Sequence, residues 1–261
     1  MPALKQPILL CLPGLGGGKY FFEPLGPLLA DVCRTVAIDP FQTIAPFAFD
    51  PAADRIVALA REERAASPGS RVCLLGHSMG TILALEAIRR SSAADLFDAL
   101  IIVGGLPEPL PESRSRIRTR ADAIRQRGII GMGAEVVAAN FSIRSQRERP
   151  TLTAWFIDRF ERQNPATYTD TADALASWHA RDLPPLDTIK CLAITGEEDR
   201  YAPPDAIRAF ARTLPPDTRV EIMPDCGHLP FLEDPPAFAA HVTAFLAVLH
   251  RSRGDSDRVS G

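Results

Sequence analysis

The sequence has no apolar run that approaches the ~18 residues a membrane-spanning helix requires. The apolar stretch near the N-terminus, within MPALKQPILLCLPGLGGG, ends in Pro-Gly and a run of glycines. It also has no A-x-A-like cleavage site, which a secretory signal peptide would carry. We therefore expect a first core strand there, no association with a membrane and a cytoplasmic location.

Excess positive charge is also missing. The chain has 29 lysines and arginines against 32 acidic residues, and its formal net charge is −3. Lysine occurs only at Lys5, Lys19 and Lys190, so arginine supplies nearly all of the positive charge. This balance gives no overall basic surface of the kind that binds nucleic acid, and we expect no nucleic-acid partner.

Paired cysteines and metal-ligand or phosphate-binding motifs are absent too. The five cysteines are scattered without a C-x-x-C pair, and Cys11, Cys73 and Cys191 lie inside apolar runs. The pattern predicts small buried thiols in a reducing compartment, not disulfides. There is no G-x-G-x-x-G with the required third glycine, no GK[ST] and no clustered His/Cys/Asp spacing. We expect neither a cofactor nor a metal.

What the sequence does contain is a series of short, continuously apolar runs separated by long connections. The runs are Ile8–Leu12, Thr35–Ile38, Arg71–Leu75, Ala99–Val103, Cys191–Thr195 and Val220–Met223. Continuous apolarity is typical of strands buried on both faces, and long connections suit right-handed βαβ crossovers. The sequence therefore predicts an α/β fold with an open, twisted and mostly parallel sheet flanked by helices.

The alternation of strands and helices stops between Leu106 and Leu183, where only helical patterns occur. These patterns cover about 113–127, 132–141, 150–162 and 165–180. We predict a core in two parts, 1–105 and 184–250, and an all-helical cap, 106–183, inserted between them. The polar tail 251–261, RSRGDSDRVSG, is predicted to be disordered.

One pentapeptide could hold a nucleophile. Gly76-His77-Ser78-Met79-Gly80 fits G-x-S-x-G, follows the third apolar run and precedes the helical pattern Thr81–Arg90. A sharp strand-to-helix turn exposes a serine hydroxyl, and small residues on either side let the backbone make that turn. The alternative is a serine in a glycine-lined turn with no catalytic role.

A serine nucleophile needs a base and a group that orients the base. Asp199 follows the fifth run, where Glu197 and Glu198 are alternative acids, and His228 follows the sixth. The order serine, acid, histidine, each at the end of a separate strand, matches the chain order of a hydrolase triad. His179, His241 and His250 fall in or beside predicted helices and are expected to be structural or exposed.

Acyl transfer also needs hydrogen-bond donors for the oxyanion that develops in the transition state. The backbone N–H of Met79, directly after the serine, is one candidate. The N–H of Leu15, in the glycine-rich loop after the first run, is the other. Plain turn glycines are the alternative interpretation of that loop.

Over nearly its whole length the chain resembles the α/β-hydrolase superfamily. The matching segments are LPGLGGG, GHSMG, GEEDRYAPP and CGHLPFLEDP, with a helical cap before Asp199. The resemblance implies Ser78 as nucleophile, His228 as base and Asp199 as the residue that orients it. It also implies an oxyanion hole made by the N–H groups of Leu15 and Met79. Pro13 departs from the histidine of many members, and we expect the two usual N-terminal antiparallel strands to be absent or reduced.

The cap and the stretch NPATYTDTADALASWHARDL resemble small esterases and 3-oxoadipate enol-lactonases. Residues 112–149 hold nine arginines against four acidic residues, which an anionic substrate or simply solvated helix faces would explain. The candidates for the substrate pocket are His77, Trp155, Phe156 and Trp178, although the aromatic side chains could instead pack the cap on the core.

The sequence thus predicts a serine hydrolase that cleaves an ester or lactone of a small molecule through an acyl-enzyme. The alternatives are a C–C bond hydrolase, a perhydrolase or a lyase-type enzyme on the same scaffold, and a non-catalytic small-molecule receptor. The sequence carries no signal for an oligomeric state.

Overall fold

The computed structural model describes residues 5–41, 46–91 and 96–256. The strands are β1 (Ile8–Leu12), β2 (Arg34–Ala37), β3 (Val72–His77), β4 (Ala99–Val103), β5 (Lys190–Gly196) and β6 (Arg219–Met223). The helices outside the β4–β5 connection are η1 (Lys19–Phe22), α1 (Leu25–Leu29), α2 (Phe49–Ala66), α3 (Met79–Arg90), α9 (Pro204–Ala211), α10 (Pro230–Glu233) and α11 (Pro235–Ser256). The helices within that connection are α4 (Pro111–Arg127), α5 (Gly133–Asn140), α6 (Ile143–Glu148), α7 (Pro150–Glu161) and α8 (Pro165–Ser177).

The strands form one sheet in the order β2-β1-β3-β4-β5-β6, and every neighbouring pair in the described residues is parallel. Every residue of β1, β3 and β4 is buried, as their continuous apolar sequences require. The edge strands β2 and β6 are partly exposed. The predicted α/β fold with a parallel sheet is confirmed, and the predicted strand ends agree with the observed ones within two residues.

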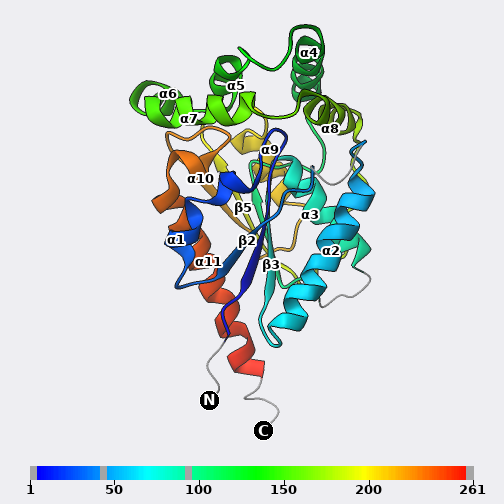
Figure 1. The fold of residues 1–261 in the computed structure, drawn as a ribbon. Coiled ribbons are helices and arrows are strands. Elements are labelled where there is room, and N and C mark those ends of the chain that lie inside the picture. Colours follow the sequence, from blue (N-terminus) through cyan, green and yellow to red (C-terminus); the bar gives the residue numbers. More distant parts are fainter. Residues whose placement is uncertain (1–4, 42–45, 92–95, 257–261) are drawn as a thin grey trace.

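Helices cover both faces of the sheet, and further helices cover the end of the sheet where the strands have their carboxyl termini (Figure 1). Helices α2 and α3 contact each other on one face, and α1 and α11 contact each other on the other face. The five helices α4–α8, here called the cap, lie over the carboxyl ends of the strands. They occupy the segment for which the sequence predicts an inserted cap, residues 106–183.

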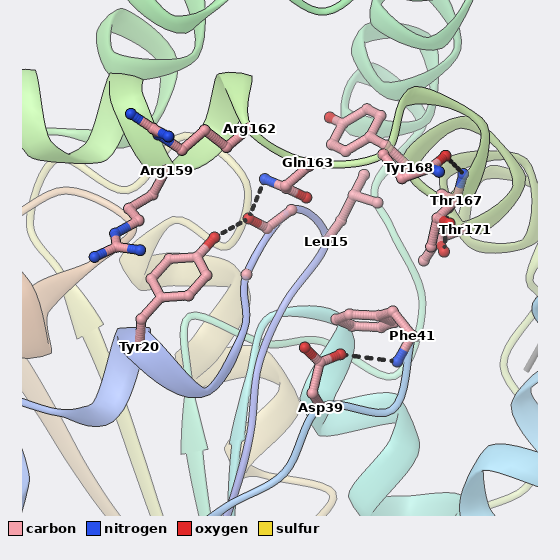
Figure 2. Close-up of a pocket in the computed structure, with 13 residues that line it drawn as sticks. Leu15, Tyr20, Asp39, Phe41, Arg159, Arg162, Gln163, Thr167, Tyr168 and Thr171 are labelled. Carbon is pink, nitrogen blue, oxygen red and sulfur yellow. Dashed lines mark hydrogen bonds between the residues drawn. The ribbon is translucent and has the colours of Figure 1, made fainter. Parts of the chain in front are cut away.

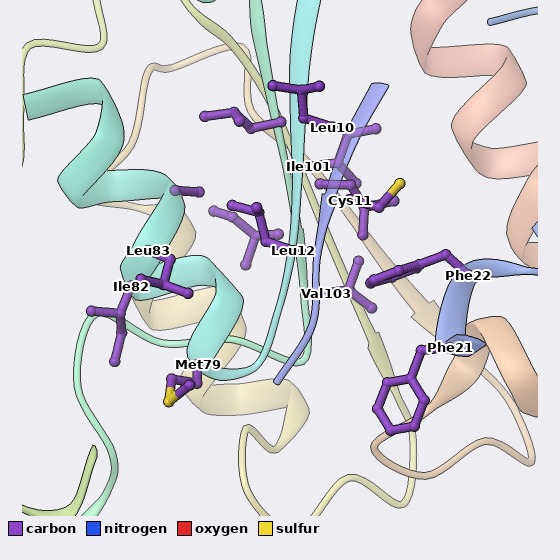
Figure 3. Packing of buried hydrophobic residues seen from close by; sticks show 14 of the residues in the cluster. Leu10, Cys11, Leu12, Phe21, Phe22, Met79, Ile82, Leu83, Ile101 and Val103 are labelled. Carbon is purple, nitrogen blue, oxygen red and sulfur yellow. The ribbon is translucent and has the colours of Figure 1, made fainter. Parts of the chain in front are cut away.

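Apolar side chains fill most of the core between sheet and helices (Figure 3). Leu12 of β1 points toward Ile82 and Leu83 of α3, whereas Cys11 points to the opposite face, toward Phe22. Burying each such leucine or phenylalanine side chain contributes about 1.5–3 kcal/mol. All five cysteines are buried and free, as predicted for the three that lie in strands.

Two helical segments differ from the sequence prediction. Helix α6 was not predicted, because its six residues are too short to show a helical period. It is fixed locally by Ser142, whose side chain accepts a hydrogen bond from Ser145 N at 3.1 Å. Helix α11 continues to Ser256, so residues 251–256 of the predicted disordered tail are helical. Extending a formed helix costs little. The rest of the predicted tail, residues 257–261, lies outside the described residues.

None of the helices in the described ranges is long and apolar enough to cross a membrane.

The loop after β1 presses directly against the first turn of α3. A Cβ atom placed on Gly80 would lie 2.2 Å from Leu12 O and 3.0 Å from Pro13 O. Both neighbours are backbone atoms, which cannot rotate away as a flexible side chain can. This close approach fixes the distance between the β1 loop and the turn at Ser78.

Gly80→Ala is therefore expected to lower the free energy of unfolding by about 1–3 kcal/mol, the usual effect of overpacking. The control is Gly26→Ala in α1, where the nearest atom to the new Cβ would be Thr35 Oγ1 at 3.9 Å. That change should be neutral or slightly stabilising, because alanine is the better helix former. Urea unfolding followed by circular dichroism measures both, and an equal effect of the two substitutions would contradict the packing described here.

Candidate active site

Ser78 occupies a strained turn between β3 and α3. Its backbone angles are φ 53° and ψ −118°, and among the described non-glycine residues only Asp225 shares a positive φ. Such a conformation costs on the order of 1–3 kcal/mol and persists only where the surroundings hold it. Here Ser78 N donates to Val103 O at 2.8 Å, and Ser78 O accepts from Thr81 N at 2.9 Å.

The glycine-rich loop after β1 lies against this turn. A Cβ atom on Gly14 would come within 2.8 Å of Ser78 Cβ and 2.9 Å of His77 Nδ1. The two predicted oxyanion donors therefore flank the serine: Leu15 and Ser78 line one cavity, and Met79 and Ser78 line the next. Met79 is the first residue of α3, where a backbone N–H has no acceptor within the helix.

Asp199 and His228 form a buried pair. His228 Nδ1 donates to the Asp199 carboxylate, at 2.8 Å from Oδ2 and 3.0 Å from Oδ1. The exposed fractions of the two residues are 3% for Asp199 and 4% for His228. The sequence left Glu197 and Glu198 as alternative acids, and the structure places Asp199 against the imidazole. Glu198 instead accepts from Ile143 N, and Glu197 is exposed.

The Asp199 carboxylate receives further hydrogen bonds. Oδ1 accepts from Tyr201 N at 2.8 Å and Ala202 N at 3.0 Å, and Oδ2 accepts from Thr195 Oγ1 at 2.9 Å. Burial alone would raise the pKa of Asp199. The charge of His228 and the hydrogen bonds from His228, Ala202 and Tyr201 outweigh burial, so the pKa lies below its ordinary value. Asp199 is therefore a carboxylate at neutral pH.

His77, directly before the serine, is held neutral. Burial, and next the nearby His228, lower the pKa of His77 well below its ordinary value. Its Nε2 donates to His228 O at 3.0 Å, and its ring lies 4.8 Å from the His228 ring. His77 Nδ1 is buried without a partner among the described residues. His77 thus holds the backbone of the His228 loop through this hydrogen bond.

Ser78 and His228 border one cavity, which has a volume of about 490 Å³ when the space open to solvent is included. The described hydrogen bonds do not include one between these two side chains. The cap and the core share the cavity wall. The cap contributes Ile117, Arg120, Val136, Asn140, Phe156, Phe160, Tyr168 and Leu175, and the core contributes Leu15, Gly16, Phe21, His77, Ser78, Tyr201, His228 and Leu229.

Two further cavities adjoin the first. One, of about 350 Å³, lies on the Met79 side and shares Ser78, Ile117, Leu175 and Tyr201 with it. The other, of about 830 Å³, shares Leu15, Gly16 and Tyr168 and is more polar (Figure 2). In Figure 2 the side chains of Tyr20 and Gln163 converge on the same backbone oxygen, that of Gly16. Cavities lined by Ser78 therefore lie on both its Leu15 side and its Met79 side.

Two of the four predicted pocket residues do not reach this cavity. His77 and Phe156 line it with Ser78, but Trp155 and Trp178 are absent from its described wall. Trp155 packs edge-on against Tyr20, with the two ring centroids 5.8 Å apart. Trp178 packs on Phe49 at 4.3 Å and donates its indole N–H to Pro107 O. Both tryptophans join the cap to the core, which is the alternative that the sequence left open.

His179 and His241 are not part of the described cavity wall. The His179 side chain is 81% exposed, and His241 lies 3.5 Å from Glu221. The side chain of His250 lies outside the described part of the structure.

The sequence prediction missed Arg120, Tyr168 and Tyr201 as wall residues of the cavity. A signal for Arg120 was present, because the buried residues of α4 repeat at helical spacing and include Ser113, Ile117, Arg120 and Ile124. An arginine within the apolar stripe of a cap helix is unusual, and its neighbours in an arginine-rich segment obscured it.

Comparison with solved structures shows the same fold in several enzymes. An enol-lactonase from Burkholderia xenovorans LB400 superposes with a TM-score of 0.80 at 20% identity, over 93% of this chain and 92% of that chain. An esterase from Exiguobacterium antarcticum gives 0.78 at 18% identity, with the same shares of the two chains. A bromoperoxidase from Bacillus anthracis gives 0.78 at 16% identity, again over 93% and 92%.

Similarity at these identities establishes the fold. The family itself is established by the family model described as "Alpha/beta hydrolase family", which matches residues 9–241 and thus most of the sequence. The chain belongs to the alpha/beta hydrolase family of enzymes.

Proposed function

We propose that this enzyme is a serine hydrolase that cleaves an ester or lactone of a small molecule. Ser78 is the nucleophile, His228 the general base and Asp199 the carboxylate that orients the base. The observation that carries the proposal is the buried His228–Asp199 pair, whose imidazole borders the same cavity as the strained Ser78. Neighbouring esterases and an enol-lactonase of the same fold support the reaction class.

The hydrogen bond to Asp199 determines which imidazole nitrogen is the base. Because the carboxylate accepts the proton of Nδ1, Nε2 keeps a free electron pair. In the proposed reaction Nε2 takes the proton of Ser78 as Oγ attacks the substrate carbonyl carbon. Asp199 then stabilises the imidazolium without taking its proton.

The negative charge that develops on the carbonyl oxygen is assigned to the N–H groups of Leu15 and Met79. Preorganised backbone donors are worth most at this step, because they need no reorganisation as the charge forms. The imidazolium next protonates the leaving oxygen, which departs as the alcohol or, for a lactone, stays tethered. Water activated by His228 then hydrolyses the acyl-enzyme.

His77 is proposed as a positioning residue for His228. Its Nε2 donates to the His228 carbonyl, and a proton on the buried, unpartnered Nδ1 would place an unsolvated charge on the ring. The neutral state matters because a second positive charge 4.8 Å from the His228 ring would oppose formation of the imidazolium.

The direct test of Ser78 is covalent labelling with a fluorophosphonate probe. Folded wild-type protein should be labelled at one site, whereas Ser78→Ala should lose at least ~99% of the labelling and of p-nitrophenyl ester hydrolysis, since a triad acts as a unit. The matched control is Ser70→Ala, which removes another buried hydroxyl, outside the described walls of the cavities at Ser78, and should leave labelling intact. Equal labelling of wild type and Ser78→Ala would exclude this mechanism.

The buried neutral state of His77 predicts a pH dependence of stability. Because its folded-state pKa lies below the unfolded value, the unfolded chain binds the extra proton. The stability linked to His77 is complete above the unfolded pKa of about 6.5 and falls as the pH decreases below it, by at most ~1.4 kcal/mol per pH unit.

His77→Gln should flatten this decline between about pH 6.5 and pH 5, as measured by urea unfolding across that range. Replacing the exposed His179 by glutamine serves as the control and should leave the decline unchanged. A wild-type curve that is already flat below about pH 6.5, or a His77→Gln curve as steep as wild type, would contradict the assignment.

A further inference from the structure

Unpartnered polar atoms gather around Ser78. Four buried side-chain nitrogen or oxygen atoms in the described residues have no hydrogen-bond partner, and three of them belong to residues that line the two cavities at the serine. These three are His77 Nδ1, Ser113 Oγ and Arg120 Nε. Buried polar groups are otherwise paired in folded proteins, so a cluster in a cavity points to a ligand that pairs them.

Arg120 is the strongest case. Its residue is only 7% exposed, and it is the only buried arginine among the nine in residues 112–149. Within the described residues it forms no ion pair with a carboxylate. A guanidinium stays protonated in proteins, and a buried charge without a counter-charge is costly. The arginine-rich composition of the cap is thus mostly a solvated surface, with one charge held at the cavity.

The contacts of Arg120 leave donors unused. Nη2 donates to Tyr201 Oη at 2.7 Å, and Nη1 lies 3.4 Å from Tyr168 Oη. Because both hydroxyls accept from the guanidinium, each keeps its own proton for another acceptor, and none is found for them in the described residues. Arg120, Tyr168 and Tyr201 therefore present positive charge and hydrogen-bond donors to the same cavity. A carboxylate supplies the matching charge and acceptors.

This donor cluster lies beside the catalytic base. The ring centroids of Tyr201 and His228 are 4.8 Å apart, and Ser78, His228, Arg120 and both tyrosines line one cavity. A molecule that contacts Ser78 can therefore reach Arg120 within its own length. A carboxylate bound at Arg120 can therefore belong to the same molecule that contacts Ser78.

We propose that Arg120, Tyr168 and Tyr201 form a carboxylate-binding subsite, so that the preferred substrates are small esters or lactones that carry a carboxylate. This inference rests on the proposed function of Ser78. It names the substrate class of the same site, and it assigns the specificity to a residue of helix α4 rather than to the general charge of the cap.

The test compares two esters that differ only at the end of the acyl chain. Mono-4-nitrophenyl glutarate ends in a carboxylate, and 4-nitrophenyl pentanoate ends in a methyl group. Wild-type enzyme should prefer the glutarate ester in kcat/KM by at least about 10-fold, since hydrogen bonds to a charged group discriminate by that order. In Arg120→Met the ratio of the two kcat/KM values should fall by about 10- to 100-fold.

Comparing the two kcat/KM values within each variant removes any effect of the substitution that lowers the hydrolysis of both esters equally. The matched control is Arg116→Met, one turn earlier on α4 and exposed, which should keep the wild-type ratio. A wild-type preference for the pentanoate ester, or the same ratio in Arg120→Met as in wild type, would overturn the subsite while leaving the serine mechanism in place.

A binding measurement separates failure of the subsite from failure of the proposed function. Glutarate should raise the thermal midpoint of Ser78→Ala at about 0.15 M salt, whereas neutral glutaramide should not, and glutarate should have no effect on Ser78→Ala/Arg120→Met. No shift with glutarate would overturn the subsite even if esters are hydrolysed. A shift in a chain whose wild type hydrolyses no ester would support the subsite and overturn the hydrolase proposal.

Discussion

Parallel pairing of the strands is the constraint on which the rest of this molecule depends. Because β1, β3, β5 and β6 all run in one direction, their carboxyl ends lie at the same end of the sheet. Leu15, Ser78, Asp199 and His228 each follow the end of a different one of these strands. Residues separated by up to about two hundred positions are thereby gathered into one site without any local sequence relation between them.

The strained turn at Ser78 and the close contact at Gly80 are two results of that arrangement. The first turn of α3 approaches the end of β1 so closely that only glycine fits at residue 80. The positive φ of Ser78 is held by backbone hydrogen bonds to Val103 and Thr81. The sheet thus fixes the backbone of the reacting groups, whereas the cap supplies about half of the cavity wall and, in Arg120, its buried charge. The proposed catalytic residues and the proposed specificity residue therefore belong to different layers of the molecule.

The parallel sheet could be predicted from the sequence, because its buried strands are continuous apolar runs. Continuous apolar runs predicted the strands. The residues that follow these runs made Ser78, Asp199 and His228 the candidates for the site, because the loops after parallel strands lie at the same end of the sheet. Side-chain direction in the cap was not predictable in the same way. Trp155 and Trp178 were expected at the pocket because they are large and apolar, but each packs between cap and core. Arg120 was hidden because an arginine in an arginine-rich helix resembles a solvated residue, and only tertiary packing shows that it is buried.

In the proposed mechanism Ser78 forms an acyl-enzyme with the help of the His228–Asp199 pair. The most direct measurement is rapid-quench mass spectrometry of the intact chain mixed with a 4-nitrophenyl ester, followed by peptide mapping. We expect a transient mass increase equal to one acyl group, carried by the peptide that contains Ser78. Ester turnover with the acyl group on a residue other than Ser78 would contradict this mechanism. So would the absence of any acylated chain at every quench time, under conditions in which release of the acyl group limits turnover.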